Sequence, residues 1–347
     1  MALTNFPNGL TSFGVPLVGG IGGIPLTGTW FFVNPATGSD ANDGLSPETP
    51  LATLYMAHHK MTAGKNDVCV LIGDGSTTGA ARLSTALAQT VNSAAAAGTL
   101  AWTKNACHLI GETAPTAAAS RAHIAPPSGT YTQATFGSGN FVTVSAQGCI
   151  FANFSLFNGF STGGNNQICW TDSGGRNSYY NVQFGGAGDA ASAASTTSRS
   201  LLITGTTGEN LFASCTIGLD TVSRGVANAS MEFAGGSPRN VFKNCLFPMV
   251  AGAATPLFIV TAAASAIDRF QWFYDCLFVN DINSSGTALT VGISMAASAG
   301  GILVMQRCTL VGGNTSTNWG DAAALSQIWV DGGAPTAGTT GLAVNPT

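Results

Sequence analysis

Charged residues are scarce in this chain of 347 residues. Asp, Glu, Lys and Arg make up 8% of the sequence, against about 25% in ordinary soluble domains. Only 12 residues are Lys or Arg, and the net charge is −4, so the concentrated basic surface that nucleic-acid binding needs is missing. A weakly charged surface on a large soluble protein is better explained if partners cover much of it.

Long hydrophobic runs are also absent. Hydrophobic residues reach 45% of the chain, but no uninterrupted stretch approaches the ~20 residues of a membrane-spanning helix. Residues 1–39 contain no charge, and Phe6–Pro25 is apolar but broken throughout by Gly and Pro. It lacks the positive start and continuous apolar segment of a signal peptide. We interpret residues 1–29 as an extended arm that gains order on a partner, or alternatively as a strand that covers the first turn of the fold.

The cysteines lack the patterns of metal or disulfide sites. There are eight, with no Cys-x-x-Cys pair, and four of them lie about 30 residues apart, which excludes the usual zinc arrangements. Stacked in register on parallel strands, such residues fit disulfide geometry poorly. The sequence therefore predicts eight reduced cysteines, consistent with assembly in a reducing cytoplasm.

What the chain does have is a repeat. Six copies share one pattern, apolar-x-Asn-like-apolar or Cys-x-apolar, and their fourth residues are spaced by 28, 33, 30, 31 and 32 positions. A fixed period near 30 residues is typical of a solenoid, in which each repeat buries its apolar face against its neighbours. The copies are Phe151–Leu156, Tyr179–Phe184, Phe212–Ile217, Phe242–Phe247, Phe273–Phe278 and Met305–Leu310.

Each copy indicates two short strands with a bend between them. Apolar residues alternate with period 2, and the phase breaks once, at the Asn-like residue, which tolerates the left-handed backbone of a tight bend. A further short apolar segment precedes each copy, beginning near residues 140, 167, 200, 229, 257 and 288. Three strands per repeat predict an all-β fold, a right-handed parallel β-helix spanning residues 30–347.

Stacking of the repeats predicts two columns of side chains. Cys215, Cys245, Cys276 and Cys308 should form an inward column, extended by Phe154 and Val182. An outer column should run through Asn153, Asn181, Ser214, Asn244, Asp275 and Arg307. Its amides can bond from one repeat to the next, and Asp275 with Arg307 should form a structural ion pair.

A short helix is predicted to close the N-terminal end of the coil. Ser46 before Pro47 and Glu48 is a typical helix start, so we expect a capping helix near residues 47–62, with the adjacent His58 and His59 on its surface. Residues 40–44 (Asp-Ala-Asn-Asp-Gly) have oxygen ligands at calcium-like spacing but no distal Glu. We interpret them as a hydrogen-bonded turn, and we predict no metal and no cofactor.

The same segment resembles the entry motif of pectate-lyase-like right-handed β-helix proteins. In that motif a strand, here Trp30–Val33, leads into Gly-Ser-Asp-x-Asn-Asp-Gly-x-Ser-x-x-x-Pro-x-x-Thr, here residues 38–53, and then a helix. Asn66–Gly73 resembles the first coil strand of the same group. With the Asn-Phe-Pro-Asn-Gly start at residues 5–9, the chain is similar to virion structural proteins of tailed bacteriophages. The resemblance implies a β-helix over roughly residues 30–333 and a place in a virus particle.

No catalytic site emerges from the residues. Gly159–Gly163 matches the Gly-x-Ser-x-Gly pattern without its strand-turn-helix context, and Gly186–Ala191 lacks the helix of a dinucleotide loop. Polysaccharide hydrolases need two carboxylates about 5 to 9.5 Å apart. The carboxylates near the repeats have no partner in phase on a neighbouring repeat: Glu209, Asp220, Glu232, Asp268, Asp275 and Asp281. Aromatic residues that could stack on sugars include Trp170, Tyr179, Tyr180, Trp272 and Tyr274, although the alternation places some of them in the core.

These observations favour a non-catalytic bacteriophage virion protein, with no catalytic, cofactor or metal residues assigned. We expect a capsid decoration protein that docks through its arm on the major capsid protein or another virion protein. We also expect it to assemble as a homotrimer, since closed symmetry is the usual outcome for identical chains. The alternative is a tailspike or tail fibre that binds or depolymerises a host glycan. Residues 85–101 and 185–198 are low in complexity and predict excursions from the coil.

Overall fold

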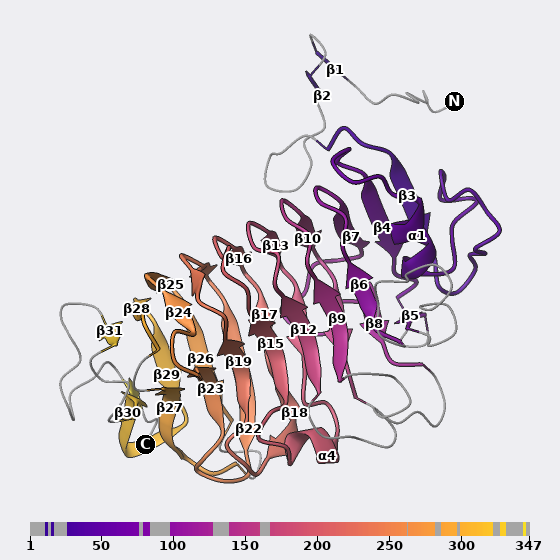
Figure 1. Ribbon diagram of the computed structural model, residues 1–347. Helices are drawn as coiled ribbons and strands as arrows, with labels where there is room; N and C mark the ends of the chain where they lie inside the picture. The colour runs from indigo at the N-terminus through magenta and orange to yellow at the C-terminus, as the bar shows by residue number, and fades with distance from the viewer. Residues whose placement is uncertain are drawn as a thin grey trace.

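The protein is a parallel β-solenoid. The computed structural model describes residues 11–12, 15–16, 26–75, 79–83, 98–127, 139–159, 167–261, 263–281, 286–296, 299–321, 327–330 and 343–344. Figure 1 shows successive turns of the coil, called rungs below, following one another from the indigo N-terminal cap to the yellow C-terminal end. No helix in these residues is long and apolar enough to cross a membrane.

Three long parallel sheets form the walls of the coil. The first sheet runs in the order β3 (Trp30–Val33), β4 (Val68–Ile72), β7 (His108–Glu112), β10 (Ile150–Ala152), β13 (Ser178–Tyr180), β16 (Leu211–Ala213), β21 (Val241–Lys243), β25 (Phe270–Tyr274), β28 (Ile302–Gln306) and β31 (Ile328–Val330). The second contains β5 (Ala81–Arg82), β8 (His123–Ala125), β11 (Ser155–Phe157), β14 (Gln183–Gly185), β17 (Thr216–Ile217), β22 (Leu246–Ala251), β26 (Leu277–Asn280), β29 (Thr309–Val311) and β32 (Ala343–Val344), with β18 (Leu219–Arg224) paired to β22.

The third sheet supplies the remaining strand of each rung. It runs from β6 (Leu100–Trp102) through β9 (Asn140–Val144), β12 (Ile168–Asp172), β15 (Arg199–Ile203), β19 (Ala229–Phe233), β23 (Leu257–Thr261) and β27 (Leu289–Met295) to β30 (Gly313–Gly320). Two small pairs lie outside these walls, the antiparallel β1 (Thr11–Ser12) with β2 (Val15–Pro16), and the parallel β20 (Ser237–Pro238) with β24 (Ile267–Asp268). Every predicted strand preceding a repeat is present in this third sheet.

The Asn-like residue of each repeat makes the bend between the first and second sheets, as predicted. All six have positive φ, between 51° at Arg307 and 58° at Asn153. The amide of Asn181 donates to Oδ1 of Asn153 at 2.8 Å, and Arg307 pairs with Asp275. The outer column therefore bonds from rung to rung, through amides at one end and an ion pair at the other.

Inside the coil, equivalent side chains stack along the axis. Aromatic rings of the first sheet, Phe151, Tyr179, Phe212, Phe242 and Phe273, stack nearly parallel with centroids 4.4 to 5.1 Å apart. The predicted cysteine column is also present. Each of its four thiols donates to the carbonyl two residues before it and to an equivalent carbonyl of the previous rung. Repeated inward positions thus build one continuous core.

Thiol titration should find no reactive cysteine in the native protein and eight after denaturation without reductant. All eight thiols are free and buried, and burial raises the pKa of Cys107 to about 11 and that of Cys149 to about 12. Thiolates, the reactive form, are therefore rare in the folded chain. A native sample that reacts rapidly, or a denatured sample with fewer than eight groups, would contradict this prediction.

The capping helix is shorter than predicted and starts later. Helix α1 covers Leu54–Lys60, with Thr53 as its N-cap. Ser46 instead closes a separate turn, in which its hydroxyl accepts the N–H groups of Glu48 and Thr49. The helix packs against β3, β4 and β6, beside the first strand of the third sheet, and Tyr55 is fully buried there. The helix that closes the N-terminal end thus covers less than half of the segment that was predicted to be helical.

His58 corrects the expectation that both histidines lie on the helix surface. Its ring packs against that of Trp102 at a tilt of 52°, with centroids 4.8 Å apart. It accepts the N–H of Thr103, and burial lowers its pKa to about 3. His59 is exposed, as expected. Lys104 donates to the carbonyls of His58, His59 and Met61, which satisfies the C-terminus of the helix.

The predicted turn at residues 40–44 and one predicted excursion are also found. Asp40 accepts the N–H groups of Ala52 and Thr53, and Asp43 accepts that of Leu45, so this segment is a hydrogen-bonded turn. In the segment 185–198 the chain leaves the second sheet and forms α4, Ala190–Ala193. The helix after Gly186–Ala191 has only four residues. Most of the excursion predicted at 85–101 lies outside the described residues.

Candidate functional site

One segment crosses the outside of the second sheet and creates the main candidate site. Ile110 and His123 pair with Ala152 and Ser155 of the next rung. Ile110 and His123 are thirteen positions apart in sequence, whereas their partners Ala152 and Ser155 are three apart. The rung of Ile110 and His123 therefore carries an insertion of ten residues. We call residues 113–122 the strap.

Outward polar side chains from three successive rungs hold the strap in place. Gln183 accepts the N–H of Ser120 at 2.7 Å and donates to the carbonyl of Thr116. The hydroxyl of Thr216 donates to the carbonyl of Ala117, and that of Ser155 to the carbonyl of Ser120 at 2.8 Å. Because one strand position on each rung contributes a bond, the strap lies across β11, β14 and β17.

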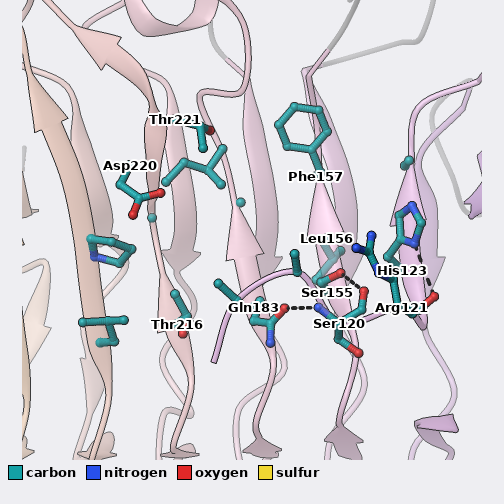
Figure 2. Close-up of a pocket in the computed structure, with 18 of the residues that line it drawn as sticks. Ser120, Arg121, His123, Ser155, Leu156, Phe157, Gln183, Thr216, Asp220 and Thr221 are labelled. Carbon is teal, nitrogen blue, oxygen red and sulfur yellow. Dashed lines mark hydrogen bonds between the residues drawn. The ribbon is translucent and has the colours of Figure 1, made fainter. Parts of the chain in front are cut away.

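A cavity of about 490 Å³ lies between the strap and the sheet. This volume is in the range of small-molecule sites, which are mostly apolar with a few polar groups. In Figure 2 the ring of Phe157 lies above Leu156, the Gln183–Ser120 contact lies below them, and Asp220 belongs to another rung on the left. The lining comprises Arg82, Ala118, Ala119, Ser120, Arg121, His123, Ala125, Ser155, Leu156, Phe157, Gln183, Gly185, Thr216, Gly218, Leu219, Asp220, Thr221, Leu246 and Pro248.

The charged groups of the cavity are mainly basic and lie at its N-terminal end. Arg82 donates to the carbonyl of Pro126 at 3.1 Å, and Nδ1 of His123 lies 3.3 Å from the carbonyl of Arg121. Asp220 is the one carboxylate of the described lining. Asp220 follows β17, and His123 lies on β8. These two strands are three positions apart in the second sheet, which is about 14 Å at the usual strand spacing. The arrangement can bind a ligand, but it does not place an acid and a base around one bond.

The six carboxylates considered from the sequence are not brought together. Glu209 pairs with Arg176 and Arg239, Glu232 with Arg199, and Asp275 with Arg307, each on a neighbouring rung. Asp268 lies 3.5 Å from the adjacent Arg269, Asp220 lines the cavity, and Asp281 follows β26. Three of these six carboxylates, Glu209, Glu232 and Asp275, therefore link rungs, whereas the sequence predicted this for Asp275 alone.

The pairings hold two of these carboxylates in their charged form. Hydrogen bonds from Arg176 and Arg239 lower the pKa of Glu209 to about 2. The guanidinium of Arg307 likewise holds the pKa of Asp275 below its usual value. A general acid of a hydrolase needs a raised pKa, so neither group is suited to that function.

The aromatic residues divide between core and surface. Trp170 and Tyr179 are fully buried, which the alternation predicted for part of this set. Tyr180 is half-buried on the outer side of the first sheet, and Trp272 and Tyr274 lie on the outer side of β25. All three of these outer residues therefore lie on the surface side of the sheet, and Trp272 is the most exposed.

Two other sequence motifs contribute no site. The described residues contain no cluster of His, Cys, Asp and Glu that could hold a metal ion. Of the Gly159–Gly163 pattern, all but Gly159 lies outside the described residues.

Sequence reasoning missed the strap and a buried amide ladder. Backbone N–H groups of Cys149, Asn177 and Asn210 each donate to the side-chain oxygen of the amide one rung on, and Asn240 donates in the same way to Gln271. The signal was present, because an amide residue stands two positions before the aromatic residue of four successive copies. The strap gave no such signal, since its rung precedes the first recognisable copy.

Comparisons with known proteins show likeness in structure only. No protein-family model and no curated protein matches the sequence. A rhamnogalacturonan lyase has a TM-score of 0.54 at 12% identity, over 84% of this chain and 70% of the lyase. The rice weevil pectin methylesterase has a TM-score of 0.52 at 10% identity, over 82% of each chain. At such low identity these likenesses show the fold alone: the chain is a parallel β-helix.

Proposed function

We propose that this chain is a non-catalytic structural protein of a tailed-bacteriophage virion, most simply a capsid decoration protein. It docks on the major capsid protein or another virion protein through the arm of residues 1–29, and it assembles as a homotrimer, since identical chains usually close by rotational symmetry. The observation that carries the proposal is that charged side chains of the repeats pair with one another between rungs. Carboxylates of the repeats are bound by arginines of neighbouring rungs and stiffen the coil.

The cavity supports the non-catalytic part of the proposal. A glycoside hydrolase places two carboxyl groups about 5 to 9.5 Å apart. Asp220 is the one carboxylate among the described residues that line the cavity. Glu209 and Asp275 have lowered pKa values and arginine partners, so they are not available as proton donors near neutral pH. The scaffold is therefore better suited to binding than to bond cleavage.

The docking part rests on the arm and on its point of attachment. Leu26 packs against Val68, Val70 and Ile150 on the outer side of the first sheet, and the N–H of Thr29 donates to Asp67. The uncharged residues 1–25 are thus joined to the body at an anchored point of its N-terminal end. An apolar segment tethered in this way can order itself along a neighbouring protein.

Deleting residues 1–25 should abolish attachment to particles and leave the coil folded. The truncation keeps Leu26, so the apolar cluster of the first sheet stays intact. Attachment is measured by adding purified protein to particles that lack it and sedimenting the mixture, while circular dichroism and thermal unfolding check the fold. A matched control replaces Glu48, an exposed turn residue, with Gln and should bind normally. Normal attachment of a folded truncated protein would refute docking through the arm.

The second candidate is a tail fibre or tailspike that binds a host glycan. The observation favouring it is the strap cavity, in which Arg82, Arg121 and His123 surround an exposed Phe157, a combination suited to an acidic sugar. Labelling the chain in intact particles separates the two candidates. Label over the whole capsid supports decoration, whereas label confined to the tail supports a fibre or spike.

A further inference from the structure

The outer side of the first sheet has an aromatic ridge at its C-terminal end. Trp272 of β25, Val304 of β28 and Trp329 of β31 are partners in register, so the two indoles lie on one line, two rungs apart. Their exposed fractions are 36% and 43%, among the highest of the large apolar residues that the structure describes. Tyr274 lies beside Trp272, with ring centroids 5.7 Å apart. Together these four residues form the ridge.

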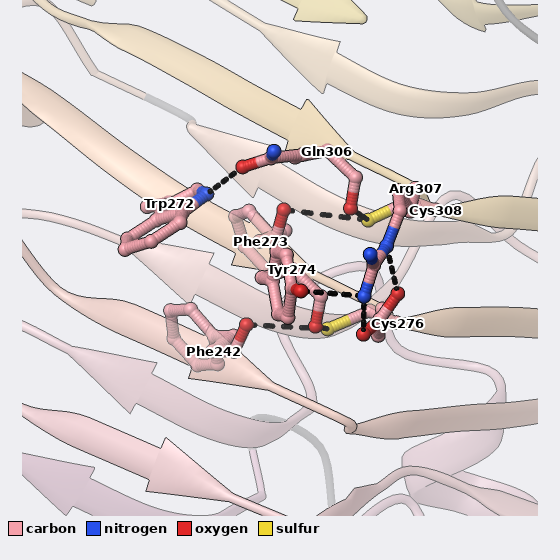
Figure 3. Close-up of polar contacts among 9 residues, drawn as sticks. Phe242, Trp272, Phe273, Tyr274, Cys276, Gln306, Arg307 and Cys308 are labelled. Carbon is pink, nitrogen blue, oxygen red and sulfur yellow. Dashed lines mark hydrogen bonds and ion pairs between the residues drawn. The ribbon is translucent and has the colours of Figure 1, made fainter. Parts of the chain in front are cut away.

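Polar contacts hold the ridge in one geometry. The indole N–H of Trp272 donates to Oε1 of Gln306 at 3.1 Å, which fixes the ring and orients the amide of Gln306 beside it. The guanidinium of Arg307 lies over the ring of Tyr274, 4.4 Å from its centroid, and pairs with Asp275. Figure 3 shows Trp272 linked to Gln306 on one side and Arg307 reaching across to Tyr274 on the other. Exposed rings prepared in this way lose little entropy on binding.

We propose that the ridge binds an extended β-1,4-linked glycan of gluco configuration, such as a glucose or N-acetylglucosamine chain, running along the coil axis. Such sugars present apolar C–H faces to aromatic rings. Successive residues of a β-1,4 chain are turned by half a turn, so every second residue presents the same face. Strand spacing places the indoles about 9.5 Å apart along the axis, close to the length of two such sugars, and Val304 leaves a lower position between them for the intervening residue.

Charge beside the rings favours a glycan over a second copy of this chain. Interfaces between proteins are depleted of Lys, Glu and Asp. Here Asp275 and Lys243 adjoin the ridge, with Nζ of Lys243 5.9 Å from the centroid of Tyr274. Hydroxyl groups of a sugar can bond with such groups and with the Gln306 amide while its C–H face stacks on the rings. The ridge is separate from the strap cavity, which lies on the second sheet, and the inference does not depend on the proposed virion function.

Titration calorimetry of the full chain with cellohexaose and with chitohexaose tests the inference. We expect binding of at least one of them and no binding of maltohexaose, whose α linkages curve the chain away from a straight row of rings. Trp272→Ala and Trp329→Ala should each weaken binding by about tenfold, equivalent to about 1.4 kcal/mol. Trp30→Ala is the matched control: Trp30 is 40% exposed at the opposite end of the same sheet, and its loss should leave binding unchanged.

Three results would overturn the inference. The first is no heat of binding for either β-linked hexamer at millimolar concentration. The second is equal weakening by Trp30→Ala, which would indicate non-specific contact with exposed indoles. The third is that Trp272→Ala changes the oligomeric state in light scattering without affecting sugar binding, which would assign the ridge to contact between copies. Circular dichroism of each variant establishes that the coil remains folded.

Discussion

Replacing Phe273 with alanine should lower the free energy of unfolding by about 3 to 5 kcal/mol, the usual cost of removing a buried aromatic side chain. Phe273 is fully buried and stacks on Phe242 with centroids 4.5 Å apart and planes 7° apart. It also contacts Phe233, Phe247 and Phe278 across the core. Backbone hydrogen bonds fix the spacing between the flanking rungs, so the rungs cannot close over the space that the ring leaves. The resulting cavity therefore adds to the free energy lost with the apolar contacts.

Phe270→Ala is the matched control for this experiment. Phe270 lies on the same strand, β25, but its side chain is 38% exposed, and surface substitutions usually change stability by less than about 0.5 kcal/mol. Urea-induced unfolding followed by circular dichroism measures both variants. Equal losses for the two variants, or a loss below about 1 kcal/mol for Phe273→Ala, would show that the aromatic stack is not a main source of stability.

The architecture could be predicted from the sequence because each rung of a solenoid uses the same pattern of inward-facing and bend residues. One inward position recurs as Tyr179, Phe212, Phe242 and Phe273, and one bend position recurs with φ near 50° to 58°. Each copy supports the interpretation of the others. The period, the strands and the stacking of the cysteines all follow from that pattern, and the structure confirms them.

The parts that occur once were predicted poorly. Ser46 has the sequence context of a helix start, but its hydroxyl closes a turn, and the helix begins only after Thr53. The N–H and the hydroxyl of Thr53 both donate to Asp40, thirteen positions earlier. His58 is buried because Trp102, forty-four positions later, packs on its ring. Such contacts depend on tertiary structure, which local sequence preferences do not contain.

The candidate site depended on two long-range features. Gln183 and Thr216 read as ordinary polar residues on the outer side of a strand, yet both hold the strap, whose bonded carbonyls lie 67 and 99 positions away in sequence. Conversely, three of the six carboxylates that suggested chemistry link rungs through arginines. An isolated Glu or Asp gives no indication of which of these two uses applies until its partner is placed.

Asp172→Ala should destabilise the protein by about 3 kcal/mol or more, because it removes the acceptor of four buried donors, of which Gly174 alone keeps a second acceptor for the same N–H, the carbonyl of Val144. Asp172 is fully buried at the end of β12. Its Oδ1 accepts the N–H groups of Gly174 and Gly175 at 2.9 and 3.0 Å, and its Oδ2 accepts from Asn177 and from the hydroxyl of Tyr179 at 3.1 and 2.6 Å. The carboxyl thus joins the third sheet to the first inside one rung, at the start of the aromatic stack.

Asp172→Asn separates the geometry of this network from its charge. Burial raises the pKa of Asp172 above its ordinary value of 3.8, so the neutral form is favoured on folding. The stability that this shift contributes is fully present below pH 3.8 and is lost as pH rises through the higher pKa of the folded state. Urea unfolding between acidic and neutral pH should therefore show wild-type stability falling relative to that of Asp172→Asn as pH rises above 3.8. A difference that stays constant would mean that the four hydrogen bonds offset the effect of burial on the pKa. A difference that grows in favour of the wild type would mean that they outweigh it and that the fold prefers the carboxylate.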